Sequence, residues 1–275
     1  MGKEITVSAS KLKTAEECQL KFNNSYVNGH WINGYVFPGL VIGNVFHQIV
    51  QWSYNQKKYK LQDLFGFIDK SWAIQLNDPK NKLRPLDLTP EKIQDHKNLI
   101  KKHLKNFYEY HVEKELLGVP AVGIEQAVRI NWTTNNGKPV VLNGYIDRIM
   151  IVDDKAVITD WKTAKKEYIP SQEEVDKDVQ LTFYSAFYRY LAKNKVDKSW
   201  PRTEEYLELF FTTIGEPKQT TRNKEHFDDL KNRVGNVVDL MTNGKKKASP
   251  SKEPYCKFCG YFGTTLCPET IGEKR

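Results

Sequence analysis

The stretch VLNGYIDRIMIVDDKAVITDWKTAK, residues 141–165, decides the fold of this chain. β-Branched and other apolar residues fill two runs, Tyr145 to Val152 and Ala156 to Thr163, and the turn formers Asp153-Asp154-Lys155 separate them. Two such runs around a short polar turn predict a β-hairpin with antiparallel strands. We expect the remaining elements to be organised around this hairpin.

Three charged side chains gather at the open end of the expected hairpin. Asp147 and Asp160 are about equally far from the turn, so antiparallel pairing places them across from each other. Lys162 lies two residues past Asp160, and the two-residue repeat of a strand puts both side chains on one face. Carboxylate oxygens suit magnesium or manganese, and a hard cation beside a lysine is typical of phosphodiester hydrolysis. The alternative is a surface hairpin whose charged residues form exposed ion pairs.

The composition predicts a globular protein with an anionic partner. The chain has 275 residues, enough for a full core, and a formal net charge of +8. A positive balance favours nucleic acid or an anionic membrane surface as the partner. No apolar run approaches the roughly 18 residues of a membrane span, and the first residues form no secretory signal. We therefore expect a cytoplasmic protein with no membrane partner, in which the four cysteines stay reduced.

A helix is expected over GLVIGNVFHQIVQWSY, residues 39–54. Its apolar residues recur at helical spacing and make one buried face, formed by Ile42, Phe46, Ile49, Val50 and Ser53. Gly43 and His47 are four apart and share a neighbouring face. The glycine leaves room for a strand or a substrate beside the imidazole, which is a competent metal ligand. The alternative is a half-buried structural histidine.

Other segments complete an α/β pattern. Thr14 and Glu17 fit a capping box, which predicts a helix that carries Cys18. Further helices are expected at 61–76, at 90–117 with Gly118 as the stop, at 178–191 and at 223–241. Strands are expected at 121–133 and 205–213. No phosphate-binding G-x-x-x-x-G-K-[S/T] loop occurs, which excludes a built-in nucleotide-driven motor.

Two of these segments carry polar residues that can serve the hairpin. Gln180 and Tyr184 are four apart on one helix face, where they can hold a phosphate or orient a nucleotide. Glu125 lies on the strand expected to pair with the hairpin, and it supports the metal site from the side or faces solvent. An incidental polar pair on an amphipathic helix is the alternative for Gln180 and Tyr184.

The four cysteines lie near the two ends of the sequence. Cys256, Cys259 and Cys267 lie close together near the C-terminal end, and the remaining cysteine is Cys18. Four thiolates bind either zinc or an iron–sulfur cluster. One distant ligand with a group of three, ending in Cys-Pro, favours the cluster over zinc. Such a cluster would join the two ends of the chain.

In chain order, the motifs are G-x-x-x-H (43–47), G-x-x-D (144–147), D-x-K (160–162) and Q-x-x-x-Y (180–184), between one cysteine and three. This order resembles the RecB-like branch of the PD-(D/E)xK nucleases. The likeness is greatest to iron–sulfur members, the small CRISPR-associated exonucleases and the nuclease domain of AddB-type proteins. It implies an α/β fold of the restriction-endonuclease type, with a mixed central sheet flanked by helices.

The resemblance assigns a role to each motif. It implies metal ligation by His47, Asp147, Asp160 and the backbone carbonyl of Trp161. Lys162 would orient or activate the attacking water, and Gln180 and Tyr184 would position the DNA strand. Gly43 and Gly144 would allow close approach of backbone and substrate. The ligands of a 4Fe–4S cluster would be Cys18, Cys256, Cys259 and Cys267.

We therefore expect a Mg²⁺- or Mn²⁺-dependent deoxyribonuclease, an exonuclease able to act on single strands. Residues 1–275 would form one nuclease domain, with 1–30 and 244–275 as the cluster-bearing ends and 61–118 as a helical insertion. A prokaryote or phage would encode it, and its protein partners would be a helicase or proteins of recombination or CRISPR adaptation. The alternatives are a non-catalytic DNA-binding or assembly subunit, an RNA-directed enzyme and a zinc-stapled binding protein.

Overall fold

The predicted hairpin is present in the computed structural model, which describes residues 4–32, 35–113, 121–194, 200–242, 256 and 259–267. The chain divides into two compact units. The first comprises Met1–Asn33, Val128–Gly144 and Arg222–Arg275, and the second comprises Gly34–Ala127 and Tyr145–Thr221. The hairpin and its charged residues belong to the second unit.

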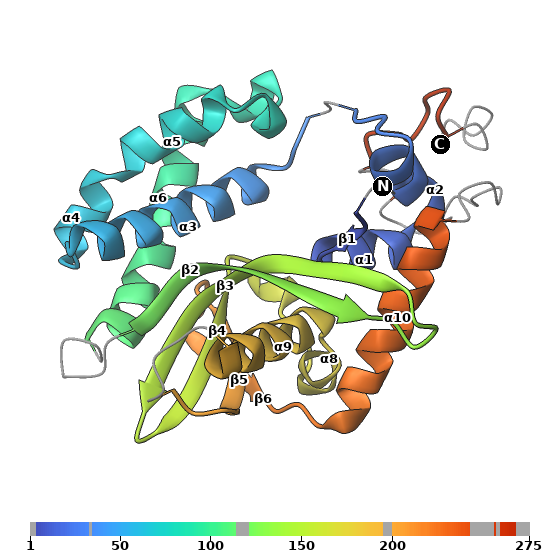
Figure 1. The fold of residues 1–275 in the computed structure, drawn as a ribbon. Helices are drawn as coiled ribbons and strands as arrows, with labels where there is room; N and C mark the ends of the chain where they lie inside the picture. Colours follow the sequence, from blue (N-terminus) through green and yellow to red (C-terminus); the bar gives the residue numbers. More distant parts are fainter. Residues whose placement is uncertain are drawn as a thin grey trace. The chain divides into compact units, whose positions relative to one another are not determined.

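The strands form one mixed sheet, which confirms the predicted α/β class (Figure 1). They are β1 (Thr6–Val7), β2 (Ala121–Thr133), β3 (Pro139–Val152), β4 (Lys155–Lys162), β5 (Glu204–Phe211) and β6 (Glu216–Thr220). The order is β1-β3-β4-β5-β6, and β2 pairs with β3. β3 and β4 are antiparallel, whereas β4 and β5 are parallel.

The β3–β4 turn follows from its two aspartates. Asp153 and Asp154 have positive φ angles of 49° and 59°, the left-handed conformation that two-residue hairpin turns require and that Asp tolerates. The register that results pairs Arg148 with Thr159. One step further, Asp147 lies across from Asp160, as the sequence predicted.

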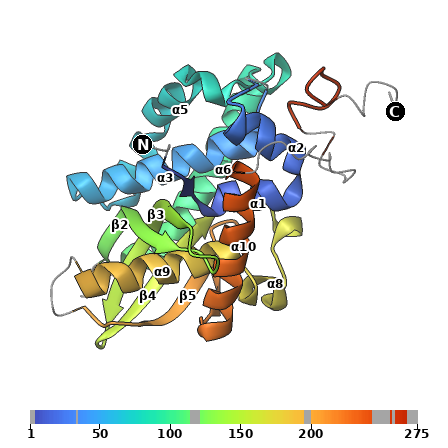
Figure 2. The same ribbon diagram turned by 45° about the vertical axis from the view of Figure 1, so that its right-hand side comes forward.

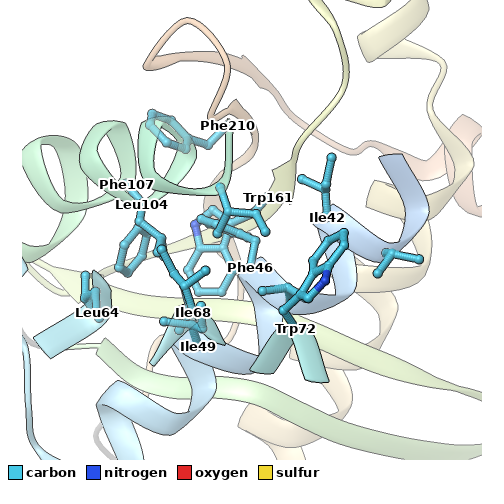
Figure 3. Packing of buried hydrophobic residues seen from close by; sticks show 14 of the residues in the cluster. Ile42, Phe46, Ile49, Leu64, Ile68, Trp72, Leu104, Phe107, Trp161 and Phe210 are labelled. Atoms are coloured by element: carbon cyan, nitrogen blue, oxygen red, sulfur yellow. The ribbon is translucent and has the colours of Figure 1, made fainter. Parts of the chain in front are cut away.

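In the second unit, one face of β4 and β5 is covered by the helices α3 (Pro38–Gln56), α4 (Leu61–Gly66), α5 (Ile68–Asn77) and α6 (Pro90–Phe107), with π-helical residues Tyr108–Val112 after α6. Figure 3 shows Phe46 of α3, Phe107 of α6 and Trp161 of β4 meeting in the buried cluster. Their rings lie edge to face, 5.4 to 6.1 Å apart. The predicted apolar face of α3 is fully buried in this cluster or beside it.

The other face of β4 and β5 carries α9 (Val179–Asn194), as Figures 1 and 2 both show. The short α8 (Gln172–Asp176) packs against β6. Because side chains alternate along β4, Trp161 points to the α3 side while Asp160 and Lys162 point to the α9 side. Short 3₁₀ turns occur at Pro79–Asn81, Pro85–Asp87 and Lys166–Tyr168.

The first unit contains α1 (Ala9–Glu17), α2 (Gln19–Phe22), π-helical residues Asn23–Val27 and α10 (Lys224–Thr242). α10 packs against α1 and β1, and β1 pairs in parallel with the first half of β3. Among the described helices, none is long and apolar enough to cross a membrane.

Several predicted boundaries were wrong. The cap of the first helix is Ser8, whose side chain accepts from Lys11 N, while Thr14 lies inside α1 and donates to Ser10 O. Cys18 is the N-cap of a separate helix, α2. The helix predicted at 61–76 is interrupted at Phe67, which separates α4 from α5. The predicted end of the next helix, residues 117–118, lies outside the described residues, and β1 and β6 were not predicted.

Candidate metal and nuclease site

Asp147 lies where the ladder between β3 and β4 ends. The last pair is Arg148 with Thr159, and beyond it the Asp147 side chain takes the place of a main-chain acceptor. Trp161 N donates a hydrogen bond of 2.8 Å to Asp147 Oδ2. The Asp147 carboxylate is therefore fixed between the two strands, within reach of side chains from both faces of the sheet.

α3 brings His47 to this carboxylate. His47 Nδ1 lies 3.8 Å from Asp147 Oδ2 and 2.7 Å from Glu125 Oε1 of β2. Gly43, one turn earlier, allows this approach, because a Cβ there would lie 3.0 Å from Thr163 Oγ1. The sequence predicted that Gly43 allows a close approach, and the group that approaches it is Thr163, directly after β4.

α9 brings an amide and a phenol to the acidic residues. The Tyr184 hydroxyl lies 3.0 Å from Asp147 Oδ1 and 2.9 Å from Asp160 Oδ1. Gln180 Nε2 donates to Asp160 Oδ1 over 2.7 Å. The two residues that the sequence pattern grouped on one helix face therefore both contact the hairpin.

Lys162 is held at its side chain and at its backbone. Its ammonium lies 2.5 Å from Asp160 Oδ2 and donates to Gln180 Oε1 over 2.8 Å. Its carbonyl oxygen accepts from both N and Oγ1 of Thr212, each at 3.0 Å. The Lys162 side chain is 31% exposed and that of His47 is 30% exposed, whereas the aspartates are buried. A substrate can therefore reach the imidazole and the ammonium.

Burial governs the ionisation of the two aspartates. It raises the pKa of Asp160 to about 6, although the Lys162 ammonium opposes the rise. Burial also raises the pKa of Asp147, with the His47 imidazole opposing it. Buried neighbouring carboxylates resist ionisation unless a cation accompanies them, which is the electrostatic condition of a cation site.

The two basic groups supply that positive charge in the ion-free protein. Burial lowers the pKa of His47, but Asp147 and Glu125 outweigh it and raise the value to about 9. Burial likewise disfavours the charged form of Lys162, and Asp160 outweighs it, so the Lys162 pKa is raised. Burial and the two aspartates raise the pKa of Tyr184 well above its ordinary value, so its hydroxyl remains a donor.

The residues present fit a divalent cation. One ligand atom each from His47, Glu125 and Asp147 can be chosen so that all lie within 4.8 Å of one another. Ligand distances of about 2.0 to 2.2 Å, as for Mg²⁺, place neighbouring ligand atoms roughly 2.8 to 4.4 Å apart. The separations of 2.7 and 3.8 Å from His47 Nδ1 are close to that range. Trp161 N points toward β3. In a strand, the carbonyl of a residue points to the same side as its N–H, so the Trp161 carbonyl faces β3 as well.

The structure also identifies contacts that the sequence left out. Glu125 was expected only as a supporting carboxylate, yet it makes the shortest contact with His47. Thr212, which holds the Lys162 carbonyl, was not singled out at all. Its place after an apolar strand parallel to β4 was the available signal, but the register between the two strands is not readable from the sequence.

The four cysteines lie in the first unit. Cys18, Cys256, Cys259 and Cys267 all line one cavity of about 20 Å³, together with Tyr261 and Phe262. A cysteine-ligated cluster is not shown, because among the described residues no three of these sulfur atoms lie within 4.8 Å of one another. Tetrahedral zinc with bonds of about 2.3 Å would place its sulfur ligands roughly 3.8 Å apart. The placement of the sulfur atoms therefore does not match a zinc site.

A family model described as "PD-(D/E)XK nuclease superfamily" matches residues 6–268 of the chain. A search of curated protein sequences found no match. A solved structure titled "Crystal structure of SSO0001" is 16% identical, with 95% of each chain covered and a TM-score of 0.40. The family match spans every residue of the site described above.

Proposed function

Because the chain belongs to the PD-(D/E)XK nuclease superfamily, we propose that it is a DNA nuclease that hydrolyses phosphodiester bonds with Mg²⁺ or Mn²⁺. The observation that carries the proposal is the meeting of Asp147, Asp160 and Lys162 at the open end of one hairpin. His47 joins them from the other face of the sheet. A binding protein has no need to bury two carboxylates beside a lysine, because burial of charged groups is costly.

His47, Asp147 and Asp160 would hold the cation, together with the backbone carbonyl of Trp161. Their carboxylate oxygens and imidazole nitrogen are donors that suit Mg²⁺ or Mn²⁺. When bound, such an ion polarises the phosphate and lowers the pKa of a bound water.

Lys162 would orient the attacking water and the phosphate. Asp160 and Gln180 fix its ammonium on two sides, so the charge is placed before substrate arrives. Gln180 and Tyr184 would position the DNA strand, while their present contacts keep both aspartates aligned. Preorganised charge of this kind needs no rearrangement during the reaction.

We assign the chain to the RecB-like branch and to exonuclease action on single strands. The branch assignment is supported by the order of the four motifs. Single-strand action is supported by three large apolar side chains that are more than half exposed at the start of α3, Tyr35, Phe37 and Leu40. The Lys82 ammonium lies 5.1 Å from the centre of the Tyr35 ring. Exposed aromatic rings beside lysine are the usual means of binding unpaired bases.

A 4Fe–4S cluster held by Cys18, Cys256, Cys259 and Cys267 belongs to the same proposal. It is supported by the lining of one cavity by all four cysteines. The activity would serve DNA processing, recombination or CRISPR adaptation, with a helicase or adaptation proteins as partners.

The proposal is tested by digestion of end-labelled oligonucleotides. Labels at the 5′ or 3′ end, single- and double-stranded substrates, and parallel reactions with a chelator define the activity and its polarity. Asp160→Asn and Lys162→Gln should each slow cleavage by roughly 10²- to 10⁴-fold, the usual effect of losing a positioned catalytic group. Lys101→Gln, an exposed lysine on α6, is the matched control and should keep the parental rate.

Two results would overturn the proposal. If both site variants cut at the parental rate with Mg²⁺, the site assignment is wrong. If the parent binds DNA without cutting it under any metal condition, the chain is a binding or assembly subunit.

A further inference from the structure

Glu125 has a backbone conformation that is unusual inside a strand. Its φ angle is +46°, in the left-handed region, although it lies within β2 and has a side chain. A left-handed residue within a strand is typical of a β-bulge, which turns a side chain to a new direction. A non-glycine residue in this conformation is strained, and such strain is found mainly at functional positions.

The exposure pattern of β2 shows what the bulge changes. Ala127, Arg129, Asn131 and Thr133 are all exposed, so a regular strand would point residue 125 toward solvent as well. Instead, the Glu125 side chain is only 16% exposed, with Oε1 2.7 Å from His47 Nδ1. The bulge therefore directs into the site a carboxylate that a regular strand would expose to solvent.

Asp160 lies outside the group of ligand atoms that surrounds His47. Its Oδ1 receives Gln180 and lies beside the Tyr184 hydroxyl, and its Oδ2 lies 2.5 Å from the Lys162 ammonium. The compact ligand group found among the described residues contains His47, Glu125 and Asp147, but not Asp160.

We propose that Glu125 is a further direct ligand of the catalytic cation, beside His47 and Asp147. This inference rests on the proposed function for the presence of a cation. It adds a ligand from β2 that none of the four motifs contains.

The competing role for Glu125 is to orient His47 by accepting its Nδ1–H. Glu125→Gln separates the two roles, because its amide oxygen still accepts that hydrogen bond but is a poor ligand for a hard cation. Mn²⁺ binding to the ion-free protein, measured by the loss of the free-ion electron paramagnetic resonance signal, requires neither DNA nor cleavage. We expect Glu125→Gln to weaken Mn²⁺ binding by about tenfold or more.

A double-mutant cycle decides between ligation and orientation. If Glu125 binds the ion directly, Glu125→Gln should still weaken Mn²⁺ binding when His47 is already replaced by alanine. If it acts only through His47, the second substitution should have no further effect, and that result would overturn the proposal. Glu216→Gln, an exposed glutamate on β6, is the control and should bind Mn²⁺ like the parent.

Glu125→Gly tests whether weaker Mn²⁺ binding could result from misfolding. Glycine adopts positive φ without strain, so this variant should resist urea at least as well as the parent. It should nevertheless bind Mn²⁺ as weakly as Glu125→Gln, and parental binding by either variant would contradict the proposal. Failure of the proposed function looks different, because the parent would then bind Mn²⁺ without cutting DNA.

Discussion

At the scale of single residues, the buried His103 of α6 supports the backbone that carries Lys162. His103 Nδ1 lies 2.9 Å from Thr212 Oγ1, and Thr212 donates that hydroxyl to the Lys162 carbonyl. His103 must therefore donate from Nδ1, which leaves its Nε2 as a bare acceptor. Among the described residues, Nε2 has no hydrogen-bond partner. Protonation of Nε2 would bury an unpaired N–H and a charge, so burial lowers the His103 pKa to about 4.

This shift makes folding stability depend on pH in a defined window. The unfolded chain binds a proton at His103 below about pH 6.5, whereas the folded protein binds it only near pH 4. The His103 contribution is therefore complete above pH 6.5 and is lost as pH falls toward 4. The loss corresponds to roughly 3 kcal/mol. Urea unfolding at a series of pH values, followed by tryptophan fluorescence, measures it.

His103→Asn is the control for this prediction. The asparagine amide keeps a donor near the position of Nδ1 and does not titrate. The difference in unfolding free energy between parent and variant should shrink or reverse as pH falls from 6.5 to 4. A difference that stays constant over that window would show that the His103 charge does not govern the acid sensitivity.

The sequence predicted which residues meet at the site where those residues belong to a motif of fixed order and spacing. His47, Asp147, Asp160 and Lys162 fall into motifs whose spacing already fixes which strand or helix face they share. Glu125 belongs to no such pattern, because its direction depends on one φ angle that the sequence does not reveal. Its inward orientation reverses what strand alternation predicts.

At the scale of elements, α3 and the end of β4 meet at Gly43. A Cβ at this position would lie 3.0 Å from Thr163 Oγ1, which is tighter than nine in ten such contacts in proteins. Thr163 directly follows Lys162, so a shift of the Thr163 backbone moves the proposed catalytic lysine relative to His47. The distance between α3 and the end of β4 therefore depends on the absence of a side chain at residue 43.

Gly43→Ala should separate activity from stability. Alanine favours a helix over glycine by about 1 kcal/mol, which offsets the clash, so the free energy of unfolding should change little. Cleavage should fall several-fold, because relief of this contact moves the groups by a few tenths of an ångström and a misplacement of about 1 Å can cost about 10²-fold. Thr163→Ala in the same chain removes the opposing atom and should restore most of the rate. No recovery in the double variant would show that the contact with Thr163 is not the cause.

The long elements were predictable because their periodicity extends over many residues. The buried face of α3 and the two strands of the hairpin match their predictions closely. The cap of the first helix was not predictable, because Thr14 and Ser8 both have suitable side chains. The choice depends on β1 ending at Val7, and that strand exists only through pairing with the distant Val141 and Leu142.

At the scale of the whole molecule, the first unit collects cysteines from positions far apart in the chain. Cys18 and the group 256–267 line one cavity although more than 200 residues separate them in sequence. Closure of such a long loop by a metal cluster restricts the unfolded chain and thereby stabilises the folded one. Sequence spacing predicted this meeting of the chain ends, but it could not reveal the sulfur geometry.

The cluster proposal gives a visible signal. Protein purified without oxygen should be brown, and Cys259→Ser should lose the colour and unfold at a lower urea concentration. The Mn²⁺ affinity of the second unit serves as the internal control, because its ligands lie on other segments. A colourless parent that contains one zinc ion per chain would contradict the iron–sulfur assignment.

The second unit is assembled from two separate stretches of chain, residues 34–127 and 145–221. During synthesis, α3 and Glu125 leave the ribosome before β3, β4, α9 and β5, which supply the acids, the lysine, the phenol and the backbone support. Translation of residues 126–221 takes roughly 5 to 20 s at usual rates. Within that interval Asp147 is made first, Asp160 and Lys162 follow, and Thr212, which supports the Lys162 backbone, comes last. The proposed site is therefore complete only when most of the second half of the chain has been made.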